Sequence, residues 1–156
     1  MKKLIIILLF ISFSAIGAGT SSSTDASTET SAQIIKLYEL AEKHIDNQSY
    51  DKSLKLLKKL TKREDLGTKR ADIYNLLGFS YRKLENPDLD KSFAAYMMAI
   101  EIDSSHLGAH EYLGELYLMR DQKDKAIFIL EKIEQLAGSN SEEYKELKNA
   151  IDEYQS

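Results

Sequence analysis

Residues 109–133 read AHEYLGELYLMRDQKDKAIFILEKI, and this stretch decides the fold. Its first half places Gly114 directly after a leucine and three residues before Tyr117. Its second half places Ala126 four residues before another leucine. Side chains three or four residues apart share one face of a helix, so each half presents one apolar face. The stretch therefore predicts two helices folded against each other as an antiparallel hairpin.

The same arrangement occurs twice more, in residues 34–60 and 73–103. In each copy a leucine precedes a small residue, an aromatic residue or His follows three places later, and a second small residue precedes a large one by four. The small residues recur at intervals of 37 and 36 in the first helices and of 39 and 34 in the second. Self-similarity at such a period predicts stacked helical repeats. The matching positions are Ala41, His44, Ser53 and Leu57, then Gly78, Tyr81, Ser92 and Tyr96.

The small residues have a physical reason. Gly78 and Gly114 fall inside predicted helices, where glycine costs about 1 kcal/mol relative to alanine. One small residue per helix allows two backbones to approach closely, and large residues four places away fill the space on either side. We therefore expect a close helix contact at each of these glycines.

These segments resemble tetratricopeptide repeats, whose motif has Leu-Gly and then Tyr on the first helix and Ala on the second. The third segment matches best, while the second has Ser92 in place of the alanine and two extra residues around Asn86-Pro87. The first is degenerate. The resemblance covers roughly residues 33–138, and none of the three keeps the closing proline of the family; Asp65, Ser104 and Gly138 stand there instead.

The expected fold is all-α, a short α-solenoid of three tetratricopeptide-like hairpins and a C-terminal capping helix. Apolar residues at helical spacing on one side of the last segment, with charged residues on the other, are what a terminal cap needs. The repeats are expected near 33–67, 68–104 and 105–138, and the cap at 141–155. The helices are expected near 33–47, 50–64, 69–85, 89–102, 106–120 and 123–137, with Ser104 or Ser105 capping the fifth.

The N-terminal residues predict export. Residues 1–18 combine Lys2 and Lys3, an apolar run and small residues, as a cleaved secretory signal peptide does. An uncleaved membrane anchor is the alternative, although the apolar run is shorter than the roughly 20 residues that cross a bilayer. The absence of Cys excludes a lipoprotein, so the periplasm is the expected location. Residues 19–32, rich in Ser and Thr, are expected to form a flexible linker, and residues 33–156 the folded domain.

Composition narrows the function. The chain of 156 residues has no Cys, which excludes disulfides, thiolate metal sites and a cysteine nucleophile. Its formal net charge of −4 gives no basic field for nucleic acid or an anionic membrane. No glycine-rich phosphate loop or nucleophile elbow occurs, and no cofactor is expected.

His106 and His110 lie four residues apart, a spacing that can place two imidazoles beside one metal ion. Leu107 stands where a zinc protease has its glutamate, and His110 takes a core position of the repeat. A metal-binding or enzymatic role for this pair is kept as an alternative to a non-catalytic protein.

The resemblance implies a concave groove lined by the first helix of each repeat, which binds a peptide or protein segment. Members that clamp a terminal carboxylate have Lys, Asn and Arg there, whereas two of the three repeats here carry acids. The expected ligand therefore has apolar and basic groups, and self-association is the other structural possibility. The groove candidates are Tyr38, Glu42, Asn75, Phe79, Arg82, Glu111 and Glu115.

Overall fold

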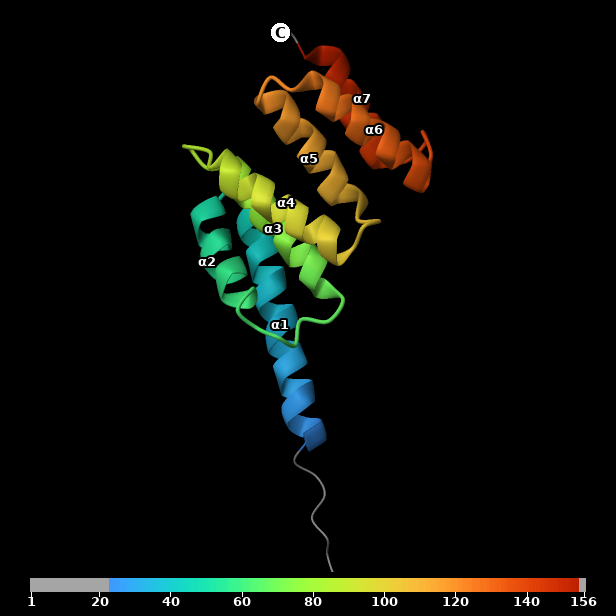
Figure 1. Cartoon of the computed structure of the whole chain (residues 1–156). Coiled ribbons are helices and arrows are strands. Elements are labelled where there is room, and N and C mark those ends of the chain that lie inside the picture. The colour runs from blue at the N-terminus through green and yellow to red at the C-terminus, as the bar shows by residue number, and fades with distance from the viewer. Residues whose placement is uncertain (1–22, 155–156) are drawn as a thin grey trace, which may run out of the picture.

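The computed structural model describes the backbone of residues 23–154 and the side chains from residue 31 onward. Within that range the chain forms helices and no strands, which confirms the all-α expectation (Figure 1). The helices are α1 (Ser23–Asp46), α2 (Tyr50–Leu60), α3 (Lys69–Arg82), α4 (Leu89–Ile102), α5 (Leu107–Met119), α6 (Lys123–Ala137) and α7 (Glu142–Glu153).

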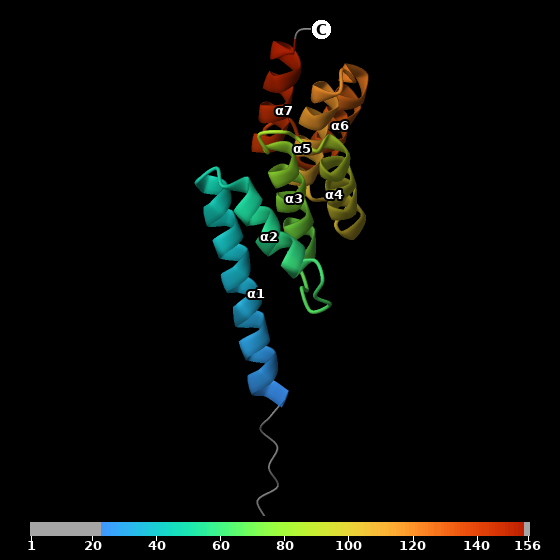
Figure 2. The same ribbon diagram turned by 90° about the vertical axis from the view of Figure 1, so that its left-hand side faces the viewer.

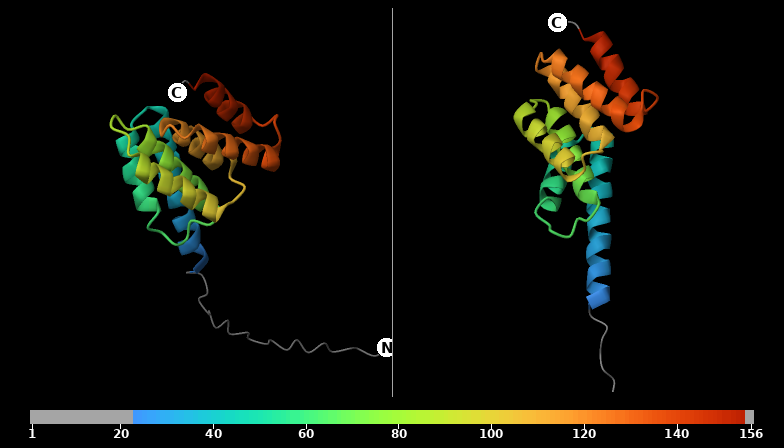
Figure 3. Two further views of the ribbon diagram at one scale, coloured as in Figure 1. Left: turned by 45° about the horizontal axis from the view of Figure 1, so that its top comes forward. Right: turned by 45° about the vertical axis from the view of Figure 1, so that its right-hand side comes forward.

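The helices pair in sequence order. α1 packs on α2, α3 on α4 and α5 on α6, while α7 covers both helices of the last pair. Each pair also contacts the next through α2 with α3 and α4 with α5. The result is the expected short solenoid, seen from further sides in Figure 2 and Figure 3.

Two apolar cores hold the stack together. One is formed mainly by α1, α2 and α3, around the fully buried Leu57, Leu60 and Ile73. The other lies among α4, α5, α6 and α7, and includes the fully buried Tyr96 and Leu147. The capping helix thus contributes a core residue of the last repeat.

Gly78 and Gly114 both lie at close helix contacts, as expected, although Gly114 meets the capping helix α7 rather than its hairpin partner α6. A Cβ atom on Gly78 would lie 2.6 Å from ring carbons of Tyr96, and one on Gly114 would lie 2.5 Å from a methyl carbon of Leu147. In the second repeat Ser92 Oγ also donates a 2.8 Å hydrogen bond to the Gly78 carbonyl. This bond across the hairpin explains how a serine occupies the motif's alanine position.

The start of α1 corrects the expected linker. Helical backbone begins at Ser23, so residues 23–32 extend the first helix (Figure 2). Among the side chains described, Ile34 is the first buried one, and residues 31–33 are exposed. A helix held by packing further along can lengthen without a new nucleus, because each added residue gains one hydrogen bond. The expected signal peptide at 1–18 lies outside the described residues.

The second helix ends at Leu60, four residues before the expected boundary. The Arg70 guanidinium donates hydrogen bonds of 3.1 and 2.9 Å to the carbonyls of residues 63 and 64, and Leu66 is buried in the first core. These contacts hold residues 61–68 as an ordered turn rather than a further helical turn. Within residues 23–154, no helix is long and apolar enough to cross a membrane.

Gly78→Ala is expected to lower the free energy of unfolding by about 2 kcal/mol, because the new methyl overlaps a ring that cannot move away. Leu57 and Leu130 occupy the place of Tyr96 in the sister repeats. In the first repeat Ala41 stands at the position of Gly78 and belongs to the same core cluster as Leu57. The alanine should therefore cost clearly less in a Tyr96→Leu background. Urea unfolding of the parent, the two single variants and the double variant measures the coupling between the two positions. If the two changes in unfolding free energy simply add, the close contact is contradicted.

Candidate functional site

The first helices of successive repeats contact one another, α1 with α3 and α3 with α5, and α5 contacts the capping helix α7. These four helices form one surface, named the first-helix face below. The sequence placed the candidate binding residues on this face, and the capping helix extends it by one helix.

Arg82 is the best-buried charge on this face, with 5% of its side chain exposed. Its guanidinium Nη1 pairs with Glu115 of α5, and its Nε donates a 3.3 Å hydrogen bond to Tyr96 Oη of α4. Burial disfavours the charge, but Tyr96 and Glu115 outweigh that effect and raise the pKa of Arg82. The arginine therefore ties three helices together and is already neutralised.

Aromatic rings lie beside this ion pair. The centroids of Phe79 and Tyr112 are 5.1 Å apart, and the Arg82 Cζ atom lies 5.6 and 5.2 Å from them. Tyr50 adds a third ring with an edge contact of 6.2 Å to Phe79. Phe79 and Tyr112 are each only half-buried. They provide apolar surface that a ligand can cover.

Glu111 lies next to the rings and is half-buried. Burial first, and then the neighbouring Glu115, Glu143 and Glu146, raise its pKa to about 7. Arg82 opposes this effect only in part, because its own partner is Glu115. Lys83 Nζ lies 5.6 Å from the Phe79 centroid. The glutamates outnumber it, so this end of the face carries an excess of negative charge beside half-buried aromatic rings.

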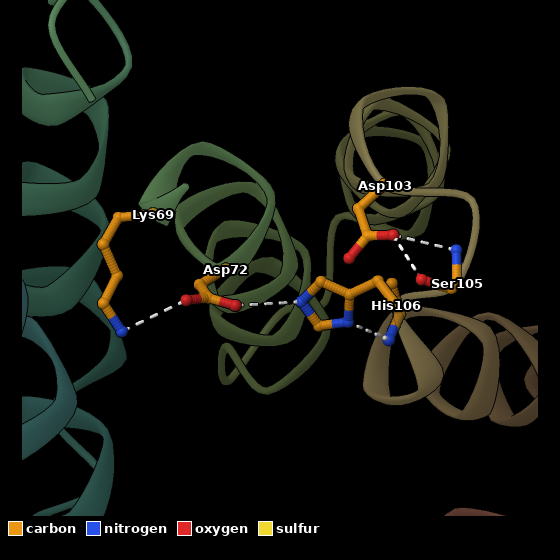
Figure 4. Close-up of polar contacts among 6 residues, drawn as sticks. Lys69, Asp72, Asp103, Ser105 and His106 are labelled. Atoms are coloured by element: carbon orange, nitrogen blue, oxygen red, sulfur yellow. Dashed lines mark hydrogen bonds and ion pairs between the residues drawn. The ribbon is translucent and has the colours of Figure 1, made fainter. Parts of the chain in front are cut away.

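A second polar cluster lies at the other end of the face (Figure 4). Lys69 Nζ is 3.2 Å from Asp72 Oδ2 and 4.6 Å from the centroid of the Tyr38 ring. His106 Nε2 is 3.2 Å from Asp72 Oδ1, and His106 Nδ1 accepts a hydrogen bond of 3.2 Å from the Ala109 amide. Because Nδ1 accepts, the proton of a neutral ring lies on Nε2, facing the carboxylate.

His106 is therefore the N-cap of α5, which corrects the expectation for Ser104 or Ser105. Ser105 instead donates to Asp103 Oδ1 from both its amide, at 2.9 Å, and its hydroxyl, at 2.7 Å (Figure 4). These bonds shape the turn that precedes the helix.

The two histidines face different partners. His110 is 4% exposed, and its Nε2 donates over 3.0 Å to the Ser104 carbonyl, while His106 faces Asp72 on α3. The rings do not converge on one position, as a shared metal ion would require. Among the described residues, no group of three or more His, Asp and Glu side chains is arranged to hold a metal ion.

The candidate residues divide into two sets. Phe79, Glu111 and Glu115 come together around one aromatic and acidic surface, and the buried Arg82 pairs with Glu115 there. Tyr38 and Asn75 are buried, at 9% and 8% exposure, so their side chains do not offer the open surface expected of them. Tyr38 lies under Lys69, and burial, followed by the nearby Glu42 and Asp72 carboxylates, raises the pKa of its hydroxyl.

Several residues of this face were missed by sequence reasoning, namely Lys69, Asp72, Tyr112, Glu143 and Glu146. Glu143 and Glu146 could have been found from the repeat period. The helix that caps the third hairpin stands where the first helix of a fourth repeat would stand. Treating that helix only as a cap concealed its contribution to the face.

Comparisons with known proteins support the fold. No family model matches the chain. It is 38% identical over 72 residues to an uncharacterized protein, ycf37, of Porphyra purpurea; the match covers 45% of this chain and only 39% of that protein's length.

Two solved structures share the architecture. The first tetratricopeptide domain of Spaghetti (RPAP3), bound to the HSP90 peptide SRMEEVD, has a TM-score of 0.65 at 16% identity and is matched over 78% of this chain and 95% of its own. MamA has a TM-score of 0.63 at 21% identity, over 82% and 74%. At these identities the likeness concerns the fold, and the chain has the tetratricopeptide-repeat fold.

Glu111→Gln should change how stability depends on pH. An acid whose pKa is raised in the folded state loses stability as the pH rises from its unfolded value, 4.5, to its folded value of about 7. The variant should therefore match the parent near pH 4 and exceed it by about 1 kcal/mol near pH 8, after allowance for solvent screening.

Urea unfolding at both pH values measures the difference. Glu134→Gln, at an exposed position on α6, serves as the control and should shift neither value. An equal effect of Glu111→Gln at both pH values would contradict the raised pKa.

Proposed function

We propose that this chain is a non-catalytic binding module that holds a segment of another protein against its first-helix face. The observation that carries the proposal is the excess of glutamate beside the half-exposed rings of Phe79 and Tyr112. Rings that stack while leaving surface open can cover an apolar group of the ligand. The glutamates attract its basic groups and select against acidic ones.

The Spaghetti domain supports the general mode of binding, since it shares the fold and is bound to a peptide. That peptide, SRMEEVD, contains three acidic residues. The face of the present chain has the opposite preference, because its arginine is paired internally and its glutamates are in excess. One fold serves unrelated partners, so the charge of this site is the better guide to its ligand.

A photocrosslinking residue at Phe79, in the cells that make the protein, tests this function. One partner should be captured, and its yield should fall about tenfold when Glu111→Gln and Glu146→Gln are combined, since negative charge that attracts it is lost. The matched control combines Glu101→Gln on α4 with Glu134→Gln on α6, two exposed positions, and removes equal charge elsewhere. No adduct at Phe79, or equal loss with both pairs, would overturn the proposed site.

We also propose that the protein works outside the cytoplasm, from the signal-peptide pattern of residues 1–18. Mass spectrometry of the protein in fractionated cells should find a mature N-terminus after Gly17 or Ala18 in the exported fraction. A chain that retains Met1 in the cytoplasmic fraction would contradict export.

A further inference from the structure

A second surface, formed by the second helices of the repeats, carries an apolar hollow. It has a volume of about 420 Å³ and lies between α4 and α6, above α5. Its apolar lining is Met97, Ile100, Leu113, Tyr117, Phe128 and Ile129.

The repeats allow this junction to be compared with the preceding one. The spacing of 39 residues places Met97 where the first repeat has Lys58. At the earlier junction Lys58 Nζ lies 5.0 Å from the centroid of the Tyr81 ring and covers it with a charged group. The later junction has the uncharged, flexible Met97 at the same place, and 42% of it is exposed. The corresponding ring there, Tyr117, still has Lys125 Nζ at 5.3 Å from its centroid, so the difference lies at Met97.

On the other side of the hollow, the third repeat also has a more apolar residue than the repeat before it. The spacing of 34 residues places Phe128 where the second repeat has Ala94. Its ring is 67% exposed, the highest value among the described large hydrophobic side chains. The junction of α4 and α6 therefore differs from the preceding one at two positions, and both differences add exposed apolar surface. Proteins in water rarely leave such patches open, so we expect another molecule to cover this one.

The Phe128 side chain also separates two hollows of this surface. A second hollow of about 320 Å³ shares His110, Phe128 and Ile129 with the first. The exposed ring therefore stands between two depressions that are each open to solvent. A projecting ring next to a hollow is the geometry that a two-fold interface needs, since both halves of the contact lie on one surface.

The charges around these hollows point to the occupant. The first is bordered by Asp124 and Lys125, and the second by Glu131 and Lys132. Two acids and two bases make this rim neutral, although the chain as a whole carries −4. Such a rim matches an identical rim turned by a two-fold rotation, whereas a strongly basic or acidic partner would gain little there.

We propose that a second copy of this chain covers the surface in a two-fold dimer, with the Phe128 ring of each copy seated in the other copy's hollow against Met97. The hollow is lined by none of the site residues Phe79, Glu111 and Tyr112 of the first-helix face, so that site stays open. The dimer would therefore present two copies of that face, which strengthens binding to any partner with two matching segments.

The size of the surface sets the expected strength. α6 has 15 residues, so the patch is about 22 Å long, and two neighbouring helices make it about 20 Å wide. That is on the order of 400 Å² per copy and 800 Å² in total, below the usual range for stable complexes. The dimer should accordingly form over the micromolar range and above.

Sedimentation equilibrium tests the proposal, using the protein with the N-terminus that it has in its own cells. The mass should rise from one chain toward two with concentration. Met97→Lys and Phe128→Ala should each weaken the dimer at least tenfold. Both place a residue that a sister repeat already carries at that position, so the fold should tolerate them, and circular dichroism would verify this.

Ile35→Lys is the matched control, because it removes another large hydrophobic side chain that is 51% exposed, on α1. It should dimerise like the parent. A parent protein that stays monomeric into the near-millimolar range overturns the proposal. So does a dimer that both variants leave unchanged, which would place the contact elsewhere.

Disulfide trapping tests the pairing directly, since the chain has no native cysteine. Mixing Met97→Cys chains with Phe128→Cys chains under oxidising conditions should give a linked dimer in high yield, and mixing Phe128→Cys with Ile35→Cys should not. Equal yields from the two mixtures would overturn the proposed geometry.

Discussion

The close approach of α3 and α4 at Gly78 is the contact on which the rest of the structure depends. The fully buried Tyr96 ring lies against the glycine. At the far end of that ring, the phenolic oxygen accepts the hydrogen bond from Arg82 Nε. The guanidinium is thereby held in position to pair with Glu115 and join the second repeat to the third. A missing side chain in a helix interior thus helps to place a buried charge where it can pair with the next repeat.

This arrangement explains the electrostatics of the first-helix face. A buried arginine needs a partner, because an uncompensated charge away from water is costly. Arg82 is compensated by Glu115 and Tyr96, so it has little positive charge left to offset Glu111 and the glutamates of α7. An unpaired arginine at this position could have bound a carboxylate of a ligand, but Arg82 is already paired with Glu115. Packing, more than composition, gives the face its acidic character.

The sequence predicted the architecture well because the repeat itself encodes it. Small residues at matching positions mark where helices cross, and the intervals between them place each hairpin. Boundaries failed where distant contacts decide them, as at Leu66 and Arg70 after α2. Site residues failed for a related reason: helical spacing placed Tyr38 and Asn75 on the correct face, but only the packed neighbours show that both are covered.

The two surfaces of the solenoid present different groups, so the two proposed contacts would depend on different forces. On the first-helix face charge dominates, and attraction between exposed charges weakens with salt. At the junction of α4 and α6 the exposed groups are apolar, and their burial is not screened in this way. The repeats share one framework, yet Met97 and Phe128 distinguish one junction from its neighbour without disturbing the small residues that set the fold. Positions that do not build the hairpin are thus free to specialise.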